Sequence, residues 1–194
     1  MTRPANPKYC FPAAPVRAEY RIADRNKMKV IGLAGWSGAG KTTLLSRAIP
    51  YLRQQGLRVS VIKHAHHDFD VDVPGKDSWV HRQSGAEEVL VTSANRWALM
   101  HELRGEDEPT LDEILSRLAP CDIVLVEGYK RELHRKIETR RLEAKDRTPL
   151  SAGDPNIVAV AADFAVTDES LSVFDLDDAK SIVDFIERMT GLVA

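Results

Sequence analysis

The sequence predicts an α/β fold built on a mostly parallel sheet with flanking helices, and three consecutive segments carry this prediction. The apolar run KVIGLAG (Lys29–Gly35) contains Val and Ile and ends in glycine, as a buried parallel strand does. Apolar residues at helical spacing follow over Lys41–Gln55, and Gly56 is a stop signal. The run RVSVIKH (Arg58–His64) is a second buried strand. Strand, glycine loop, helix and strand form a βαβ unit.

Composition limits the classes of protein to which the chain can belong. Its 194 residues suit one globular domain, and 43% hydrophobic with 29% charged residues is close to the average for water-soluble proteins. A formal charge of -2 gives no global attraction to nucleic acid or to an anionic membrane. We expect residues 1–27, which carry four prolines and no sustained period, to form an extension with little fixed structure. Residues 28–194 then form the folded domain, and the absence of a signal-peptide pattern predicts a cytoplasmic protein.

An added β-hairpin region is predicted after the βαβ unit. A short helix is expected over Ser78–Gly85, and the strands Glu87–Ser93 and Arg96–Leu103 are joined by a turn at Ala94 and Asn95. Thr110 and Glu113 have the spacing of a capping box, which predicts a helix that runs to Leu118. The sequence therefore places an antiparallel pair between parts of a parallel sheet.

The remaining third of the chain supplies further strands and a final helix. Buried strands are expected at Cys121–Gly128 and Asn156–Asp163, a weaker strand around Leu171–Phe174, and an amphipathic helix over Asp178–Met189. Residues 130–147 are rich in both basic and acidic side chains. We favour a solvated hairpin for this segment over a surface that binds an anionic ligand or an acidic partner.

The loop between the first strand and its helix has the pattern GxxxxGK[ST]. Its residues are Gly35, Trp36, Ser37, Gly38, Ala39, Gly40, Lys41 and Thr42, followed by Thr43. Glycines let successive backbone N–H groups turn toward a phosphate, and the helix N-terminus adds its positive dipole end. Lys41 then reaches the β and γ oxygens and the Thr42 hydroxyl binds Mg²⁺. The context of strand, loop and helix predicts a fold like that of the P-loop NTPases.

A P-loop NTPase also needs an acid near Mg²⁺, at the carboxyl end of a neighbouring strand. The segment DIVLVEGYK offers Asp122 at the start of its strand and Glu127 at the end. Because the phosphates bind where the strands end, we assign this role to Glu127. Asp122 is interpreted as a surface charge or a turn residue.

The stretch KHAHHDFDVDVPGKDS, residues 63–78, follows the second strand and is expected at the same sheet edge. A carboxylate there could bind Mg²⁺ or orient water, and a basic side chain could contact phosphate. The acidic candidates are Asp70, Asp72 and Asp77, and the basic ones are Lys63, His64 and Lys76. A nickel or zinc site on His64, His66 and His67 is one alternative, since imidazole suits such metals. A solvated loop is the other.

From about Met28 onward the chain resembles the bacterial molybdopterin-guanine dinucleotide biosynthesis adaptors, the MobB family. The blocks that carry the resemblance are GxxxxGKTT, KHAHHDFDVDVPGKDS, RWALM with DIVLVEGYK, and PNIVAVAAD, in this order. The second block is the most specific, since phosphate loops are widespread. The resemblance implies a GTP-binding homodimer with weak GTPase activity. It also implies a partner, the molybdopterin guanylyltransferase that attaches GMP to molybdopterin, with molybdopterin itself as a further ligand.

On this reading the cofactors are GTP and Mg²⁺. Lys41, Asp77 and Glu127 are the catalytic candidates, and Thr42, Glu127 and Asp77 are the metal ligands. The nucleotide-binding set adds Lys63, His64, Lys130 and Asp163 to the loop residues from Gly35 to Thr43, and Lys136 is expected to face phosphate or the partner.

Base selectivity is not encoded in a familiar motif, because no [NT]KxD tetrapeptide is present. Asp163, which leaves a strand at the same edge, is a substitute reader of guanine, or else an ordinary turn acid. Two rival functions stay open: an ATP-dependent small-molecule kinase or ligase similar to dethiobiotin synthetase, and a nickel metallochaperone GTPase.

Overall fold

The described chain forms two compact units. A computed structural model describes residues 28–65, 69–167 and 170–192. One unit comprises the chain up to His64 and from Leu118 onward, and the other comprises Ala65–Arg117. The extension predicted at residues 1–27 lies outside the described residues.

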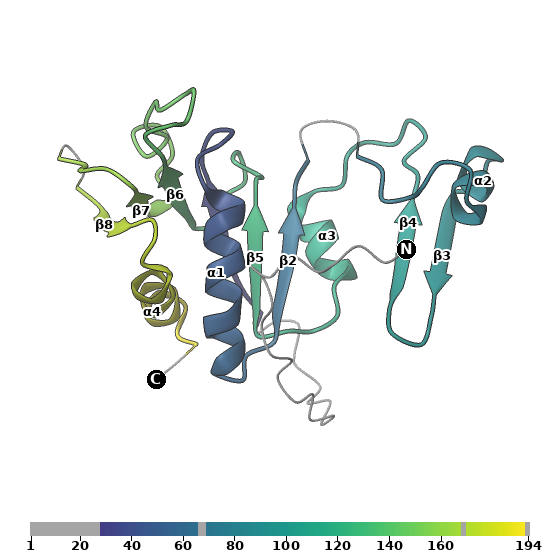
Figure 1. The fold of residues 1–194 in the computed structure, drawn as a ribbon, viewed down its shortest axis with the longest axis horizontal. Helices are drawn as coiled ribbons and strands as arrows, with labels where there is room; N and C mark the ends of the chain where they lie inside the picture. The colour runs from purple at the N-terminus through teal and green to yellow at the C-terminus, as the bar shows by residue number, and fades with distance from the viewer. Residues whose placement is uncertain (1–27, 66–68, 168–169, 193–194) are drawn as a thin grey trace, which may run out of the picture. The chain divides into compact units, whose positions relative to one another are not determined.

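The first unit is built on a six-stranded sheet in which every pair of neighbouring strands is parallel (Figure 1). The order across the sheet is β2-β5-β1-β6-β7-β8. The strands are β1 (Lys29–Ala34), β2 (Val59–Lys63), β5 (Ile123–Glu127), β6 (Lys136–Arg140), β7 (Ile157–Ala162) and β8 (Ser172–Asp175). The predicted α/β class with a mostly parallel sheet is confirmed.

Helices α1 (Lys41–Gln54) and α4 (Ala179–Thr190) pack over the sheet and supply the core with apolar side chains. Leu44 and Leu52 of α1, and Ile182 and Ile186 of α4, are almost completely buried against strand residues such as Ile31. Helix α4 begins at a cap in which Asp178 accepts a hydrogen bond from the Ser181 N–H, at 3.0 Å. The burial of these apolar side chains is the main source of the free energy that holds α1 against the sheet. It thereby also fixes the position of the loop before α1.

The sheet has a topological switch point at β1. The chain leaves β1 through α1 and returns at β2, beyond β5, whereas β6, β7 and β8 lie on the other side of β1. In open parallel sheets ligands bind outside the carboxyl ends of the strands where the connections diverge in this way. A ligand-binding site is therefore expected at the end of β1, next to Ala34.

The second unit contains the antiparallel pair that the sequence predicts. Its elements are α2 (Asp77–Gln83), β3 (Glu88–Thr92), β4 (Trp97–His101) and α3 (Leu111–Arg117), with Leu90 of β3 opposite Leu99 of β4. The capping box before α3 is present: the Thr110 N–H donates to Glu113 Oε2 at 2.7 Å, and the Glu113 N–H donates to Thr110 Oγ1 at 3.3 Å. Among the described helices, none has both the length and the apolar character needed to span a bilayer.

The prediction of a solvated hairpin over residues 130–147 is wrong. Strand β6 lies inside the sheet between β1 and β7, and all five of its residues are buried. Its charges are matched locally, because Lys136 pairs with Asp154 and Arg140 pairs with Glu138, each at 2.8 Å. Paired charges can occupy an interior position that isolated charges cannot.

Candidate functional site

The loop between β1 and α1 is held in a conformation that depends on glycine. Gly35 has φ 151° and Gly40 has φ 91°, which are backbone conformations that favour glycine. A Cβ at Gly35 would come within 2.6 Å of Thr139 Oγ1, and a Cβ at Gly40 within 2.9 Å of Leu176 Cδ2. The loop thus passes close to β6 and to the segment after β8. Both glycines are therefore required by the fold itself.

Lys41, the first residue of α1, turns back across the loop. Its ammonium group donates to the carbonyl oxygens of Gly35 and Trp36, each at 3.0 Å. Burial lowers the pKa of Lys41; the carboxylate of Glu127 opposes this effect, while the positive charges of Lys130 and Lys63 add to it. An anionic ligand would stabilise the charge of this half-buried ammonium group, which lies beside two further cations.

Thr42 and Glu127 meet although 85 residues separate them. The Thr42 hydroxyl lies 2.9 Å from Glu127 Oε1 and 3.1 Å from Oε2, and the Glu127 residue is 8% exposed. The meeting follows from the sheet, because Glu127 ends β5, the neighbour of β1, while Thr42 lies in the first turn of α1 after β1. The structure therefore brings the acid at the strand end to the hydroxyl of the phosphate-loop motif.

This pair of oxygen groups fits a magnesium ion. Mg²⁺ prefers hard oxygen ligands and is usually held by one or two carboxylates or hydroxyls together with phosphate oxygens and water. The hydroxyl of Thr42 and the carboxylate of Glu127 are such ligands, and the ammonium group of the adjacent Lys41 favours an anionic group beside them. These two residues are the ones that would hold the ion.

Lys63 and His64 lie at the same edge of the sheet. Lys63 ends β2 and is the register partner of Glu127, and the His64 N–H donates to the Glu127 carbonyl oxygen at 2.8 Å. The imidazole ring of His64 packs on Tyr129, with ring centroids 4.5 Å apart. Lys130 places its ammonium group over the Trp36 ring, 4.3 Å from the centroid. Basic groups from β2 and from the loop after β5 thus surround the end of β1.

Asp122 lies at the opposite end of β5 and has a structural role. Its carboxylate accepts hydrogen bonds from Arg58 Nε at 3.1 Å and from Arg58 Nη2 at 3.0 Å. The backbone N–H of Arg58 also donates to Asp122, at 2.6 Å. The residue therefore ties the start of β2 to the start of β5, at the far end of the strand from Glu127.

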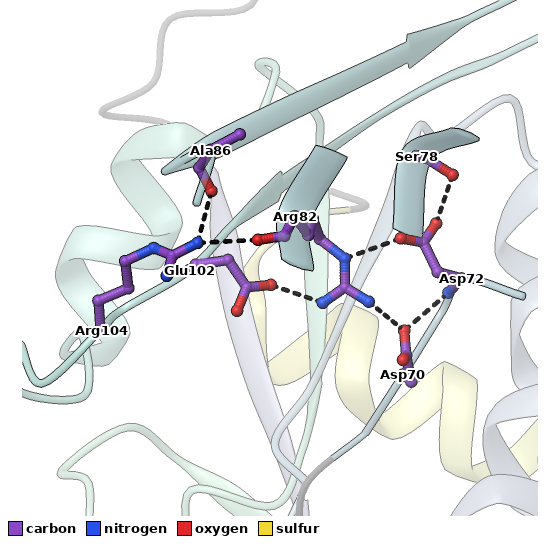
Figure 2. Close-up of polar contacts among 7 residues, drawn as sticks. All are labelled: Asp70, Asp72, Ser78, Arg82, Ala86, Glu102 and Arg104. Carbon is purple, nitrogen blue, oxygen red and sulfur yellow. Dashed lines mark hydrogen bonds and ion pairs between the residues drawn. The ribbon is translucent and has the colours of Figure 1, made fainter. Parts of the chain in front are cut away.

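The aspartates of the stretch after β2 belong to the second unit and are engaged there. Figure 2 shows Arg82 between three carboxylates, with Asp70 and Asp72 each at 2.7 Å and Glu102 at 2.6 Å. Asp72 also accepts from the Ser78 hydroxyl at 2.8 Å. Asp70 and Asp72 are therefore ion-pair partners of Arg82. The spacing of these residues in the sequence did not reveal this pairing.

The remaining candidates of residues 63–78 are Asp77, Lys76 and two histidines. Asp77 is the first residue of α2 in the second unit, and Lys76 precedes it as the N-cap. The histidines His66 and His67, on which the nickel or zinc alternative depends, lie outside the described residues. Within the described ranges no group of three His, Cys, Asp or Glu side chains could hold a metal ion.

Asp163 follows β7 at the same sheet edge as the loop. Its Oδ1 accepts the Leu142 N–H at 2.7 Å, and its Oδ2 lies 3.5 Å from Arg141 Nε. Sequence reasoning missed Arg141, whose guanidinium carbon lies 3.5 Å from the position of a Cβ at Gly40. The signal in the sequence was the alternation KIETR, which places Arg141 just beyond the end of a strand.

The prediction that Lys136 faces phosphate or a partner is wrong. Its side chain is fully buried, and its ammonium group donates to the Glu132 carbonyl oxygen and to Asp154. His134 lies close by, and burial, followed by the charge of Lys136, lowers its pKa to about 4. This cluster stabilises the start of β6.

The chain has a P-loop NTPase-like fold, with a glycine-rich loop, a lysine and an acid at the switch point of its parallel sheet. The family model described as "Molybdopterin guanine dinucleotide synthesis protein B" (MobB) matches residues 30–163. The chain belongs to the MobB family.

Relatives and solved structures agree with this assignment. The chain is 40% identical over 167 residues to the molybdopterin-guanine dinucleotide biosynthesis adapter protein of Escherichia coli, with 85% of this chain and 95% of the relative covered. It is 38% identical over 165 residues to the adapter protein of Haemophilus influenzae, with 84% and 90% covered. A crystal structure of molybdopterin-guanine biosynthesis protein B has a TM-score of 0.65 and 29% identity, covering 82% of this chain and 99% of the other.

Proposed function

We propose that the protein is a Mg²⁺-dependent GTP-binding adapter with weak GTPase activity that assists the attachment of GMP to molybdopterin. The family membership supports the pathway, since its curated relatives are named as adapters of molybdopterin-guanine dinucleotide biosynthesis. On this proposal the partner is a molybdopterin guanylyltransferase, and the protein acts as a homodimer. The observation that carries the nucleotide site is the contact of the Thr42 hydroxyl with Glu127, directly after Lys41.

Each residue of the site has a task in this proposal. The backbone N–H groups from Gly35 to Thr43 donate to the triphosphate, and Lys41 exchanges its two carbonyl acceptors for phosphate oxygens. Thr42 and Glu127 would hold magnesium, which would neutralise part of the negative charge of the phosphates. Lys63 and Lys130 add positive charge at the rim, and Glu127 also orients a water molecule near the terminal phosphate.

Three further candidates are assigned from their places in the chain. His64, whose ring packs on Tyr129, is assigned to the nucleotide-binding residues at the carboxyl ends of β2 and β5. Asp163, which follows β7, is assigned to contact the nucleoside part of the nucleotide. Asp77, the first residue of α2, remains a proposed ligand of magnesium or of the attacking water. The ATP-dependent kinase or ligase and the nickel metallochaperone remain rival predictions.

Replacing Lys41 tests the proposal. Lys41→Ala removes a charge-assisted contact worth about 1.5–3 kcal/mol, so GTP affinity falls by roughly tenfold or more. Isothermal titration with GTP and Mg²⁺ measures this, with Lys180→Ala, an exposed lysine of α4, as the matched control. Unchanged GTP affinity in Lys41→Ala contradicts the assignment. A preference of the wild-type protein for ATP with fast turnover of an acceptor favours the kinase or ligase instead.

A further inference from the structure

The site has a direction along the sheet edge. Thr42 and Glu127 mark the magnesium end on the β5 side of β1, where the terminal phosphates bind. On the other side of β1, Gly40 lies against Leu176, which follows β8, and against Arg141, which follows β6. If the proposed function holds, the nucleoside end of the triphosphate therefore points toward β7 and β8.

A shallow, open cavity of about 340 Å³ lies on this side of the loop, where the nucleoside is expected. It is formed where β7 and β8 end, and its lining includes Asp163, Phe164, Val166, Val173, Phe174 and Asp175. This volume is at the lower end of the range for small-molecule sites, about 300–1,000 Å³, and a few polar groups among apolar and aromatic side chains are typical of such sites. The cavity thus suits a single heterocyclic base.

The two carboxylates of the cavity differ in how many of their oxygens have a partner within the described part of the chain. Asp163 has both oxygens engaged, one by the Leu142 N–H and the other by Arg141. Asp175 uses Oδ1 to accept the Asp177 N–H at 2.9 Å. Its Oδ2 makes no hydrogen bond or ion pair to any residue within the described part of the chain. Asp175 is therefore the carboxylate that can receive donors from a ligand, and Asp163 positions Arg141 beside Gly40.

We propose that this cavity binds guanine and that Asp175 reads it, accepting hydrogen bonds from N1–H and from the N2 amino group. Guanine presents these two donors side by side, which matches a carboxylate. Adenine has an acceptor at N1 and no N2 amino group, so it would place a lone pair against the negative charge. Half-buried Phe164 offers an apolar surface for the ring. The proposal rests on the proposed function and adds base selectivity to it without an [NT]KxD motif.

The test exchanges the carboxylate for an amide. Asp175→Asn keeps an oxygen that can accept the Asp177 N–H, so the loop after β8 stays intact. The amide donor opposes the N2 amino group of guanine but complements the C2 carbonyl of xanthine. Isothermal titration with GTP, XTP and magnesium tripolyphosphate should show GTP affinity reduced about 10- to 100-fold, XTP affinity increased, and tripolyphosphate affinity unchanged. Asp184→Asn, on an exposed part of α4, is the matched control.

The outcomes separate this inference from the proposed function. If Asp175→Asn leaves GTP affinity and the preference over XTP unchanged while Lys41→Ala weakens GTP binding about tenfold or more, Asp175 does not read the base and the inference is overturned. A switch toward XTP in Asp163→Asn instead also overturns it. If the wild-type protein binds neither GTP nor tripolyphosphate, both the proposed function and the inference fail.

Discussion

Lys136 gives the sharpest prediction about stability, because it is a fully buried lysine in the middle of a sheet. Lys136→Met keeps the aliphatic length and removes the two hydrogen bonds of the ammonium group. The remaining carboxylate of Asp154 stays partly satisfied, since Asn156 donates to it from its backbone N–H at 2.9 Å and from Nδ2 at 3.0 Å, and its side chain is 22% exposed. We expect the free energy of unfolding to fall by about 1–3 kcal/mol.

The partner replacement should cost more. Asp154→Asn leaves a positive charge with no exposure and with the Glu132 carbonyl as its remaining strong acceptor. Removing one partner of a buried pair costs about 3–5 kcal/mol when the other charge has no access to water. The double variant should be more stable than the sum of the two single losses predicts, by about 1 kcal/mol or more.

Urea denaturation of the four proteins, followed by circular dichroism, measures this cycle. Arg135→Met, an exposed neighbour, is the matched control and should change stability by less than about 0.5 kcal/mol. Equal losses for the two single variants, with strict additivity, would refute the reasoning. So would an unchanged stability of Lys136→Met combined with a tenfold loss of GTP affinity, since the lysine would then reach a ligand.

Two further variants probe the neighbouring groups. The native pKa of His134 is about 4, below its ordinary value, so the unfolded chain binds a proton more readily and stability falls as the pH drops from about 6.5 toward 4. After allowance for solvent at the half-buried ring, His134→Leu should remove about 1 kcal/mol of this loss between pH 7 and pH 5; identical urea midpoint shifts in the two proteins would contradict it. Glu127→Gln should weaken Mg²⁺-dependent GTP binding about tenfold, yet leave or slightly improve binding in EDTA, because a negative charge near the phosphates is gone. Equal effects with and without Mg²⁺ would show that Glu127 has no role at the ion.

Several parts of the fold were readable from the sequence because they depend on short-range chemistry. The phosphate loop, the capping box at Thr110 and the apolar strand before Glu127 each involve residues a few positions apart. The spacing of apolar residues and the positions of glycines are therefore enough to predict these features. The choice of Glu127 over Asp122 followed from one rule about strand ends, and the structure places the two at opposite ends of β5.

Other features depended on which distant segments meet. The sequence by itself determined the class of fold, the loop and the acid at the strand end. Only the tertiary structure decided that a charge-rich segment is a buried strand, because Lys136 pairs with Asp154 and Glu138 accepts hydrogen bonds from the backbone N–H groups of Leu150 and Ser151. It also decided that Asp70 and Asp72 bind Arg82. The physical reason is that whether a charge can be buried is set by its partner, and the partner of a charge does not follow from local periodicity.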